Sequence, residues 1–320
     1  MKMASVAGIL FTKIARAAGN INPDIVEKKH IDIVKNLRSM EPLFRHYFPP
    51  IGYTFEKKDV NGVPTEIFRK KKGGSDNLVL YIHGGAYVSR MMFYYRLLNK
   101  RWSKASGGGT VVHFDYRCAP EHVYPAALED TMTVWDWLEE QGVKPDKIVT
   151  VGDSAGGHLT VSLWMKLREQ GRELPRASVL MSPWLDMTAG GKSYVENYGV
   201  DPVFGIKGKT ITEEGVKSLL KRSDIFMWLG DSDRTDPYIS PILNEFDDKY
   251  PPSFVTVGGD EMLRSDAETL VEKLKNAGVE ATLLVGDRMM HAYPVYQIFP
   301  EARQALKAIS AFIRGQYGLD

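Results

Sequence analysis

Short apolar runs alternate with helical patterns through most of this 320-residue chain. The runs that we expect to be strands are 78–82, 110–114, 147–151, 178–181, 253–257 and 281–285. Because helical patterns separate them, neighbouring strands should run in parallel, in a sheet covered on both faces. Before them, two alternating stretches, 53–60 and 65–69, are joined by Asn61-Gly62, which predicts an antiparallel hairpin. The sequence therefore predicts an α/β fold.

The alternation stops between about Asp186 and Tyr250, where glycines and charges are frequent. Within this stretch the best helical pattern covers 213–220. An insertion lying over the edge of the sheet would explain why the alternation stops. The first 45 or so residues are also helical in pattern and end before Pro49-Pro50. No linker or repeat divides the chain, so we expect one domain over residues 1–320.

Charge excludes some partners. Lys and Arg number 41 against 40 Asp and Glu, so the net charge of +1 indicates no nucleic-acid footprint and no trap for acidic substrates. Cys118 is the single cysteine, which rules out an intramolecular disulfide and favours a cytoplasmic protein. No run approaches the ~18 apolar residues of a membrane span.

The N-terminus leaves export open as the weaker alternative. Lys2 precedes an apolar stretch, and 15–17 (Ala-Arg-Ala) mimics a cleavage site, although charges interrupt both. Val6, Leu10 and Ile14 are spaced four residues apart, which instead predicts an amphipathic helix with a single apolar face.

The segment Val151–Gly157 reads as a strand, a sharp turn with Ser154 at its apex, and a helix. This is the layout of a nucleophile elbow, in which glycines two residues to each side leave room for a strained turn. The serine hydroxyl then lies beside a helix N-terminus, whose free amides favour the negative charge that develops at a carbonyl under attack. Ser154 is thus the candidate nucleophile.

A nucleophilic serine needs a base and an orienting acid, which follow it in the order acid, then histidine, in such folds. Of the two later histidines, His158 lies inside the elbow helix, whereas His291 follows the last expected strand at the same sheet edge as Ser154. Asp260 follows the strand 253–257 and two glycines, which makes it the expected acid; Asp266 competes but falls within a helical pattern.

Two amide donors should face the oxyanion. One is Ala155, the residue after the nucleophile. The other is expected from Gly84 and Gly85, because they follow the strand 78–82 and their bare backbone can approach a ligand closely.

Five ordered motifs, spanning roughly residues 78–293, resemble the hormone-sensitive-lipase-like branch of the α/β-hydrolases, the bacterial esterases with a GDSAGG elbow. They are His83-Gly84-Gly85-Ala86, 115–122 (DYRCAPEH), 124–130 (YPAALED), 152–157 (GDSAGG) and Ser182-Pro183-Trp184. Two late loops depart from that pattern. Glu261-Met262 stands after Asp260 where Pro-Leu is usual, and Ala292-Tyr293 replaces Gly-Phe after His291.

The resemblance implies an eight-stranded, mostly parallel sheet with helices on both faces and a helical cap. The cap would comprise about 1–48 and 187–247, and the catalytic core about 51–186 and 248–320. It also implies that Ser154, Asp260 and His291 form the triad, and that Gly84, Gly85 and Ala155 form the oxyanion hole. The implied activity is serine carboxylesterase or lipase chemistry on a small ester, through an acyl-enzyme and with neither metal nor organic cofactor.

Several alternatives remain open. Family habit suggests short- to medium-chain acyl groups, held by aromatic and thioether side chains among Tyr87, Met91, Trp184, Phe226 and Trp228. The same triad would also serve an amidase or a sugar or sterol deacetylase, because the triad sets the chemistry and the cap sets the substrate. A ligand-binding module without hydrolysis, resembling the plant hormone receptors of this superfamily, is a third reading. A homodimer is a possible assembly.

Overall fold

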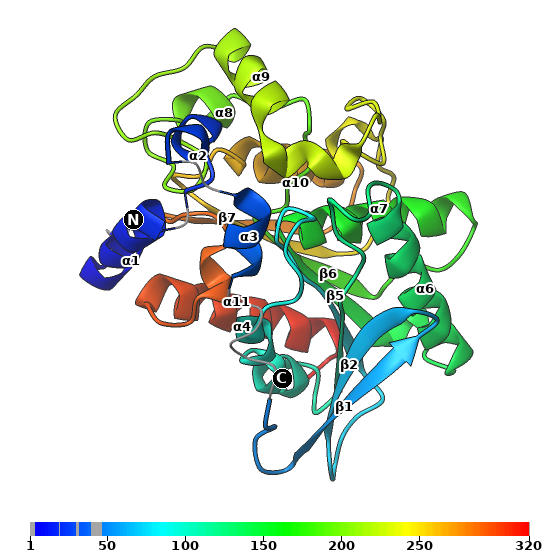
Figure 1. Cartoon of the computed structure of the whole chain (residues 1–320). Coiled ribbons are helices and arrows are strands. Elements are labelled where there is room, and N and C mark those ends of the chain that lie inside the picture. Colours follow the sequence, from blue (N-terminus) through cyan, green and yellow to red (C-terminus); the bar gives the residue numbers. More distant parts are fainter. Residues whose placement is uncertain (1–3, 19, 30–31, 40–46, 320) are drawn as a thin grey trace.

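The computed structural model describes residues 4–18, 20–29, 32–39 and 47–319, and these form an α/β fold around a sheet of eight strands (Figure 1). The strands are β1 (Tyr53–Val60), β2 (Val63–Lys70), β3 (Leu78–Ile82), β4 (Thr110–Phe114), β5 (Ile148–Asp153), β6 (Ala177–Met181), β7 (Ser253–Gly258) and β8 (Ala281–Gly286). Their order across the sheet is β1-β2-β4-β3-β5-β6-β7-β8. The β1–β2 and β2–β4 pairs are antiparallel and all others are parallel, which confirms the predicted fold class.

Helices cover both faces of the sheet (Figure 1). They are α4 (Phe93–Arg96), α5 (Asn99–Ala105), α6 (Ala126–Glu140), α7 (Ala155–Glu169), α10 (Arg264–Asn276) and α11 (Pro300–Gln316). Leu80 of β3 packs with α6 and α7, whereas its neighbours Val79 and Tyr81 pack with α5 and α11. Alternate side chains of a strand point to opposite faces, so the buried run 78–82 feeds two cores at once.

The helical pattern predicted over 91–106 is two short helices, α4 and α5. Between them Leu97 is exposed, whereas Leu98 is buried together with Tyr95 of α4 in the same core as Trp102 of α5. The chain therefore turns to bury both helices, which periodicity alone does not reveal.

The remaining helices come from the two ends of the expected cap. The first 39 residues supply α1 (Val6–Ala18), α2 (Pro23–Lys29) and α3 (Ile33–Arg38), and the insertion supplies α8 (Ser193–Glu196) and α9 (Glu213–Arg222). Asn20 donates to the carbonyl oxygens of Pro202 (3.0 Å) and Gly205 (2.8 Å), and Arg222 of α9 pairs with Asp24 of α2 at 2.8 Å. The two segments thus pack on each other, as Figure 1 shows for α2, α8 and α9. Lys2 and residues 40–46, part of the expected N-terminal helical region, lie outside the described residues.

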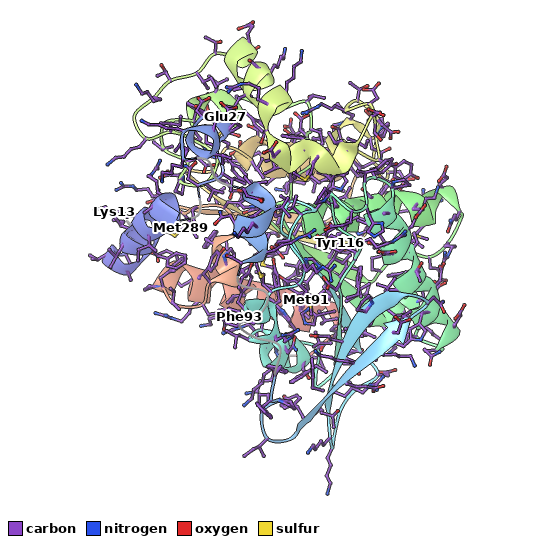
Figure 2. The ribbon with its side chains drawn as sticks, in the orientation of Figure 1. Lys13, Glu27, Met91, Phe93, Tyr116 and Met289 are labelled. Atoms are coloured by element: carbon purple, nitrogen blue, oxygen red, sulfur yellow. The ribbon has the colours of Figure 1, made fainter. Side chains whose placement is uncertain are left out.

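Helix α1 packs through a different face from the one predicted. Val6, Leu10 and Ile14 are 84%, 57% and 54% exposed. Gly8 instead faces α11 and Met289, which lies beside α1 in Figure 2, because a Cβ on Gly8 would be 3.1 Å from the Met289 Cε. The small residue lets α1 approach α11 closely. Phe11 of α1 packs against Tyr296 and Phe299, with ring centroids 5.1 and 5.3 Å apart. Among the described residues, no helix is long and apolar enough to cross a bilayer.

Candidate active site

The elbow has the predicted strand–turn–helix form. Ser154 joins β5 to α7 with φ +53° and ψ −119°, a backbone conformation that is costly for a residue with a Cβ. The flanking glycines are needed sterically, since a Cβ on Gly156 would lie 1.9 Å from the carbonyl oxygen of Ile82. The same atom on Gly152 would lie 2.3 Å from the carbonyl oxygen of Gly156. The tight turn therefore places Ser154 at the carboxyl edge of the sheet.

His291 reaches Ser154 from the loop after β8. Its Nε2 lies 2.9 Å from the Ser154 Oγ, a good hydrogen-bond distance. The other ring nitrogen, Nδ1, lies 3.4 Å from Oε2 of Glu261. That distance is longer than a good hydrogen bond, but catalytic hydrogen bonds are often long before substrate binds. The structure therefore brings together a serine, a histidine and a carboxylate in series.

The carboxylate in this series is Glu261, and the prediction of Asp260 is corrected here. Glu261 is fully buried, whereas Asp260 is half-buried beside Arg288 and Asp287. The backbone explains the switch, because the Asp260 amide donates to the carbonyl oxygen of Met289 at 3.1 Å and so fixes the loop one residue earlier. The next side chain is then the one directed inward to His291.

A signal for Glu261 was present in the sequence. In the resembled family a Pro-Leu pair follows the acid, and here Met262-Leu263 is the nearest equivalent. Matching Leu263 to the leucine of that pair moves the acid position from Asp260 to Glu261. Asp266, the other competitor, is buried in α10, where its carboxylate accepts from the amides of Leu185 (2.8 Å) and Asp186 (3.0 Å).

Carboxylates near His291 raise the pKa of its imidazole. Burial disfavours the imidazolium, but the neighbouring carboxylate of Glu261 outweighs it, and the pKa of His291 is raised above its ordinary value. Asp201, fully buried, adds to this effect from the insertion. Its carboxylate accepts hydrogen bonds from the amides of Phe204 (3.0 Å), Val203 and Met262 (2.6 Å each), so it joins the insertion to the Glu261 loop.

The loop after β3 contains the expected glycines, but their amides have different partners. The Gly84 amide donates to Oδ1 of Asp153 (3.1 Å) and to the Tyr95 hydroxyl (3.2 Å), so the prediction that it faces an oxyanion is corrected. No side chain fits at this position, because a Cβ would lie 3.0 Å from the Ser154 Cβ. Among the described residues, no acceptor is found for the amides of Gly85, Ala86 and Ala155.

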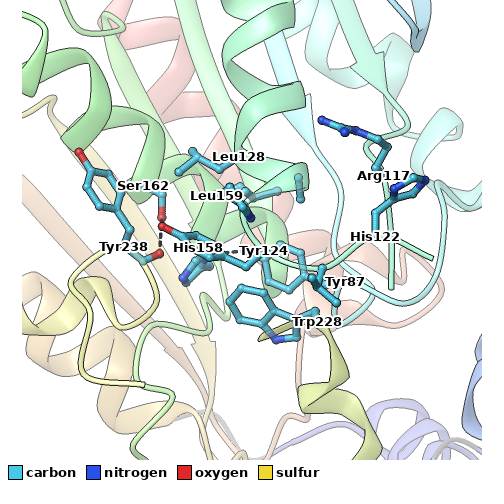
Figure 3. A pocket seen from close by; sticks show the side chains of 13 residues that line it. Tyr87, Arg117, His122, Tyr124, Leu128, His158, Leu159, Ser162, Trp228 and Tyr238 are labelled. Atoms are coloured by element: carbon cyan, nitrogen blue, oxygen red, sulfur yellow. Dashed lines mark hydrogen bonds between the residues drawn. The ribbon is translucent and has the colours of Figure 1, made fainter. Parts of the chain in front are cut away.

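The expected pocket residues fall into three places. Trp184 and Phe226 line an almost wholly apolar cavity of about 30 Å³ between α9, α2 and the Met262-Leu263 turn. Tyr87 and Trp228 line a second cavity next to α7, where their rings stack at 4.1 Å (Figure 3). Met91 belongs to neither, since it borders a polar surface hollow with β1 and β2.

Residues 79–295 match a family model described as the alpha/beta hydrolase fold. An esterase of Acinetobacter venetianus is 32% identical over 244 residues, which cover 76% of each chain. Esterase LipU of Mycobacterium tuberculosis is 32% identical over 246 residues, covering 77% of this chain and 80% of its own.

Two solved structures are similar at 36% identity. One is a variant of the esterase E40, with a TM-score of 0.76 over 89% of this chain and 92% of its own. The other is an esterase from the bacterial hormone-sensitive lipase family, with a TM-score of 0.73 over 89% and 90%. The matched family model, these relatives and the ordered motifs agree: the chain belongs to the α/β-hydrolases, in the hormone-sensitive-lipase-like branch of esterases.

Proposed function

We propose that this carboxylesterase works through an acyl-enzyme on Ser154, with His291 as general base and Glu261 as the orienting carboxylate. The observation that carries the proposal is the position of the His291 ring, 2.9 Å from the Ser154 Oγ on one side and 3.4 Å from Glu261 Oε2 on the other. A base held in this way removes the serine proton as the oxygen attacks, and the carboxylate fixes its tautomer and stabilises the imidazolium.

The reaction has two halves. The Ser154 Oγ bonds to the ester carbonyl carbon while its proton passes to Nε2 of His291. The tetrahedral intermediate then expels the alcohol, which takes that proton, and leaves an acyl-serine. Water attacks the acyl-serine, gives a proton to His291, and releases the carboxylic acid as the Ser154 hydroxyl is restored.

The amides of Gly85, Ala86 and Ala155 are the donors that we assign to the oxyanion. They lie on the two loops that meet at Ser154, and no protein acceptor competes for them among the residues described. Donors fixed in advance stabilise the developing charge without reorganisation, and each is worth about 10²- to 10³-fold in rate.

We propose that the acyl group enters the apolar cavity lined by Trp184 and Phe226. The Trp184 amide donates to the carbonyl oxygen of Ser154 at 3.2 Å, and Phe204, on the same cavity wall, contacts the His291 ring at 5.1 Å. A cavity of about 30 Å³ suits short chains, with medium chains needing movement of the cap segments. Apolar walls match an alkyl chain and offer little to a sugar hydroxyl.

The test is hydrolysis of nitrophenyl esters from acetate to dodecanoate, with phosphonate labelling of Ser154. We expect a short-chain optimum and the loss of both activities in Ser154→Ala. Parallel assays with a nitroanilide and an acetylated sugar test the amidase and deacetylase alternatives. An unlabelled Ser154 and silence on every ester would refute the proposal and leave the ligand-binding alternative.

We also propose a cytoplasmic site of action. The sequence has one cysteine, Cys118, so the chain can form no intramolecular disulfide. Its thiol is buried, and its Sγ donates to the carbonyl oxygen of Tyr116 at 3.2 Å. A buried thiol of this kind needs no oxidising compartment. Homodimer formation is a separate proposal that sedimentation of the purified chain would decide.

A further inference from the structure

The loop that carries the oxyanion amides has an unusual backbone. Gly85, Ala86 and Tyr87 follow one another with φ values of +124°, +53° and +61°. The left-handed region is costly for alanine and more so for the bulky tyrosine. A strained loop of this kind persists only where its surroundings hold it, so the contacts of Tyr87 are important.

Tyr87 is tied down at both its backbone and its side chain. Its carbonyl oxygen accepts from the amide of Ala119 at 2.8 Å. The ring is 2% exposed and stacks on Trp228 at 4.1 Å. Its hydroxyl lies 3.2 Å from the carbonyl oxygen of Ala155 and contacts Nδ1 of His158 (Figure 3). One side chain therefore connects the loop to the helix that begins at Ser154.

His158 is held so that it can only accept from Tyr87. Burial lowers its pKa to about 4, which keeps the imidazole neutral at physiological pH. Its Nε2 lies 2.9 Å from the carbonyl oxygen of Ile239, which has no proton to give, so Nε2 carries the proton. Nδ1 is then an acceptor, and it shares the single proton of the Tyr87 hydroxyl with the carbonyl oxygen of Ala155. With both nitrogens engaged, His158 is not available as a base for Ser154.

We propose that Tyr87 and His158 form a positioning pair, which holds the strained loop so that the amides of Gly85 and Ala86 face the oxyanion. The proposal rests on the esterase mechanism above. It assigns to both residues a positioning role, because in that mechanism neither residue transfers a proton or needs to contact the substrate. Because Ile239 lies within the insertion expected over 187–247, the pair also connects the loop to that segment.

Tyr87→Phe is the decisive variant, because it keeps the stacked ring and removes only the hydroxyl. We expect kcat for nitrophenyl butyrate to fall about 10-fold, less than the loss of a whole oxyanion donor, because the amides are displaced and not deleted. KM should stay within about two-fold. Affinity for a trifluoromethyl ketone, which forms an oxyanion on Ser154, should fall in parallel with kcat, since both depend on the same amides.

His158→Leu supplies the second arm. If the two residues act as one unit, Tyr87→Phe combined with His158→Leu will lose little more activity than either change alone. Tyr317→Phe is the matched control, since its hydroxyl likewise lies within hydrogen-bond distance of two acceptors, the backbone carbonyl oxygens of Leu78 (2.9 Å) and Lys147 (2.8 Å). Leu78 begins β3, so these contacts lie at the opposite edge of the sheet from Ser154, and kcat should not change.

We express kcat per active site titrated with a phosphonate. A loss of folded protein is then not counted as a loss of rate caused by displaced amides. Values of kcat and ketone affinity within two-fold of wild type in Tyr87→Phe would overturn the proposal. So would a variant that loses thermal stability or titratable sites but keeps its kcat per site. A wild-type protein that hydrolyses no ester would overturn the esterase mechanism itself, and the pair's role with it.

Discussion

The Ser182 hydroxyl lies 2.9 Å from Oε2 of Glu261, the same oxygen that faces His291. The hydroxyl also accepts from the amide of Ala292 at 2.9 Å, so one buried side chain joins the loop after β7 to the loop after β8. Ser182 holds this place with φ +50°, in the left-handed region. The position of the Glu261 carboxylate relative to the His291 imidazole therefore depends on Ser182, which belongs to neither loop.

Replacing Glu261 by Gln should reduce kcat/KM by about 10²- to 10⁴-fold, since a carboxylate that orients a catalytic histidine is worth up to that much. Asp260→Asn is the matched control, one residue away and similarly charged, and should stay within a few-fold of wild type. Steady-state hydrolysis of nitrophenyl butyrate by both variants decides whether Glu261 or Asp260 orients His291. The reverse ranking would restore Asp260 as the acid.

The elbow and the position of His291 beside Ser154 were predictable because each is fixed by local sequence and chain order. The acid was not, because its identity depends on where the backbone of the Asp260 loop is pinned. That register is set by a hydrogen bond to Met289, about 30 residues later in the chain. The partners of the Gly84 amide could not be predicted for a similar reason, since Asp153 and Tyr95 lie elsewhere in the chain.

Ser182→Ala should lower kcat about 10-fold, because a hydrogen bond to a charged group contributes roughly 1.5–3 kcal/mol. Without this donor the Glu261 carboxylate will bind the imidazolium more strongly. The acid limb of the kcat/KM profile should therefore move to higher pH. Ser182→Gly relieves the positive φ but also lacks the hydroxyl, so it should behave like the alanine variant. A full rescue by glycine would show that backbone strain, and not the hydroxyl, matters.

The pH dependence of wild type should reflect the raised pKa of His291. Only the neutral imidazole can accept the Ser154 proton, so activity is lost as pH falls through that pKa. We expect the acid limb of kcat/KM to have its midpoint above the ordinary histidine value of about 6.5. In Glu261→Gln the stabilising charge is gone and burial dominates, so the residual activity should titrate at lower pH. Equal midpoints in the two proteins would contradict the assignment.

The fold was predictable where the apolar pattern leaves one choice. The central strands are apolar on both sides, and α11 is apolar on one. Helix α1 shows the limit of that rule. Its sequence offers an apolar stripe, Val6-Leu10-Ile14, but the face that contains Gly8 and Phe11 is the one that packs. Choosing between two apolar faces requires the shape of the partner surface, which the local sequence does not contain.

Asp201 should make the folded protein less stable as pH rises from about 4 to about 6. Burial raises its pKa to about 6, the like charge of Glu261 adds to this, and the amides of Phe204, Met262 and Val203 oppose it. The folded protein then binds this proton more tightly than the unfolded chain, whose aspartate pKa is about 3.9. The contribution of Asp201 to stability is therefore highest below about pH 4 and falls as pH rises to about 6.

Asp201→Asn cannot ionise and should remove that dependence. It will also lose the acceptor for the Met262 amide, which adds a destabilisation that does not vary with pH. Between pH 4 and 7, the unfolding free energy of Asp201→Asn relative to wild type should rise by up to about 3 kcal/mol, from the shift of about two pKa units. Urea denaturation at several pH values measures it, with the exposed Asp248→Asn as a control for losing one negative charge. A difference that stays flat across this range would mean that Asp201 is ionised in the folded protein without cost.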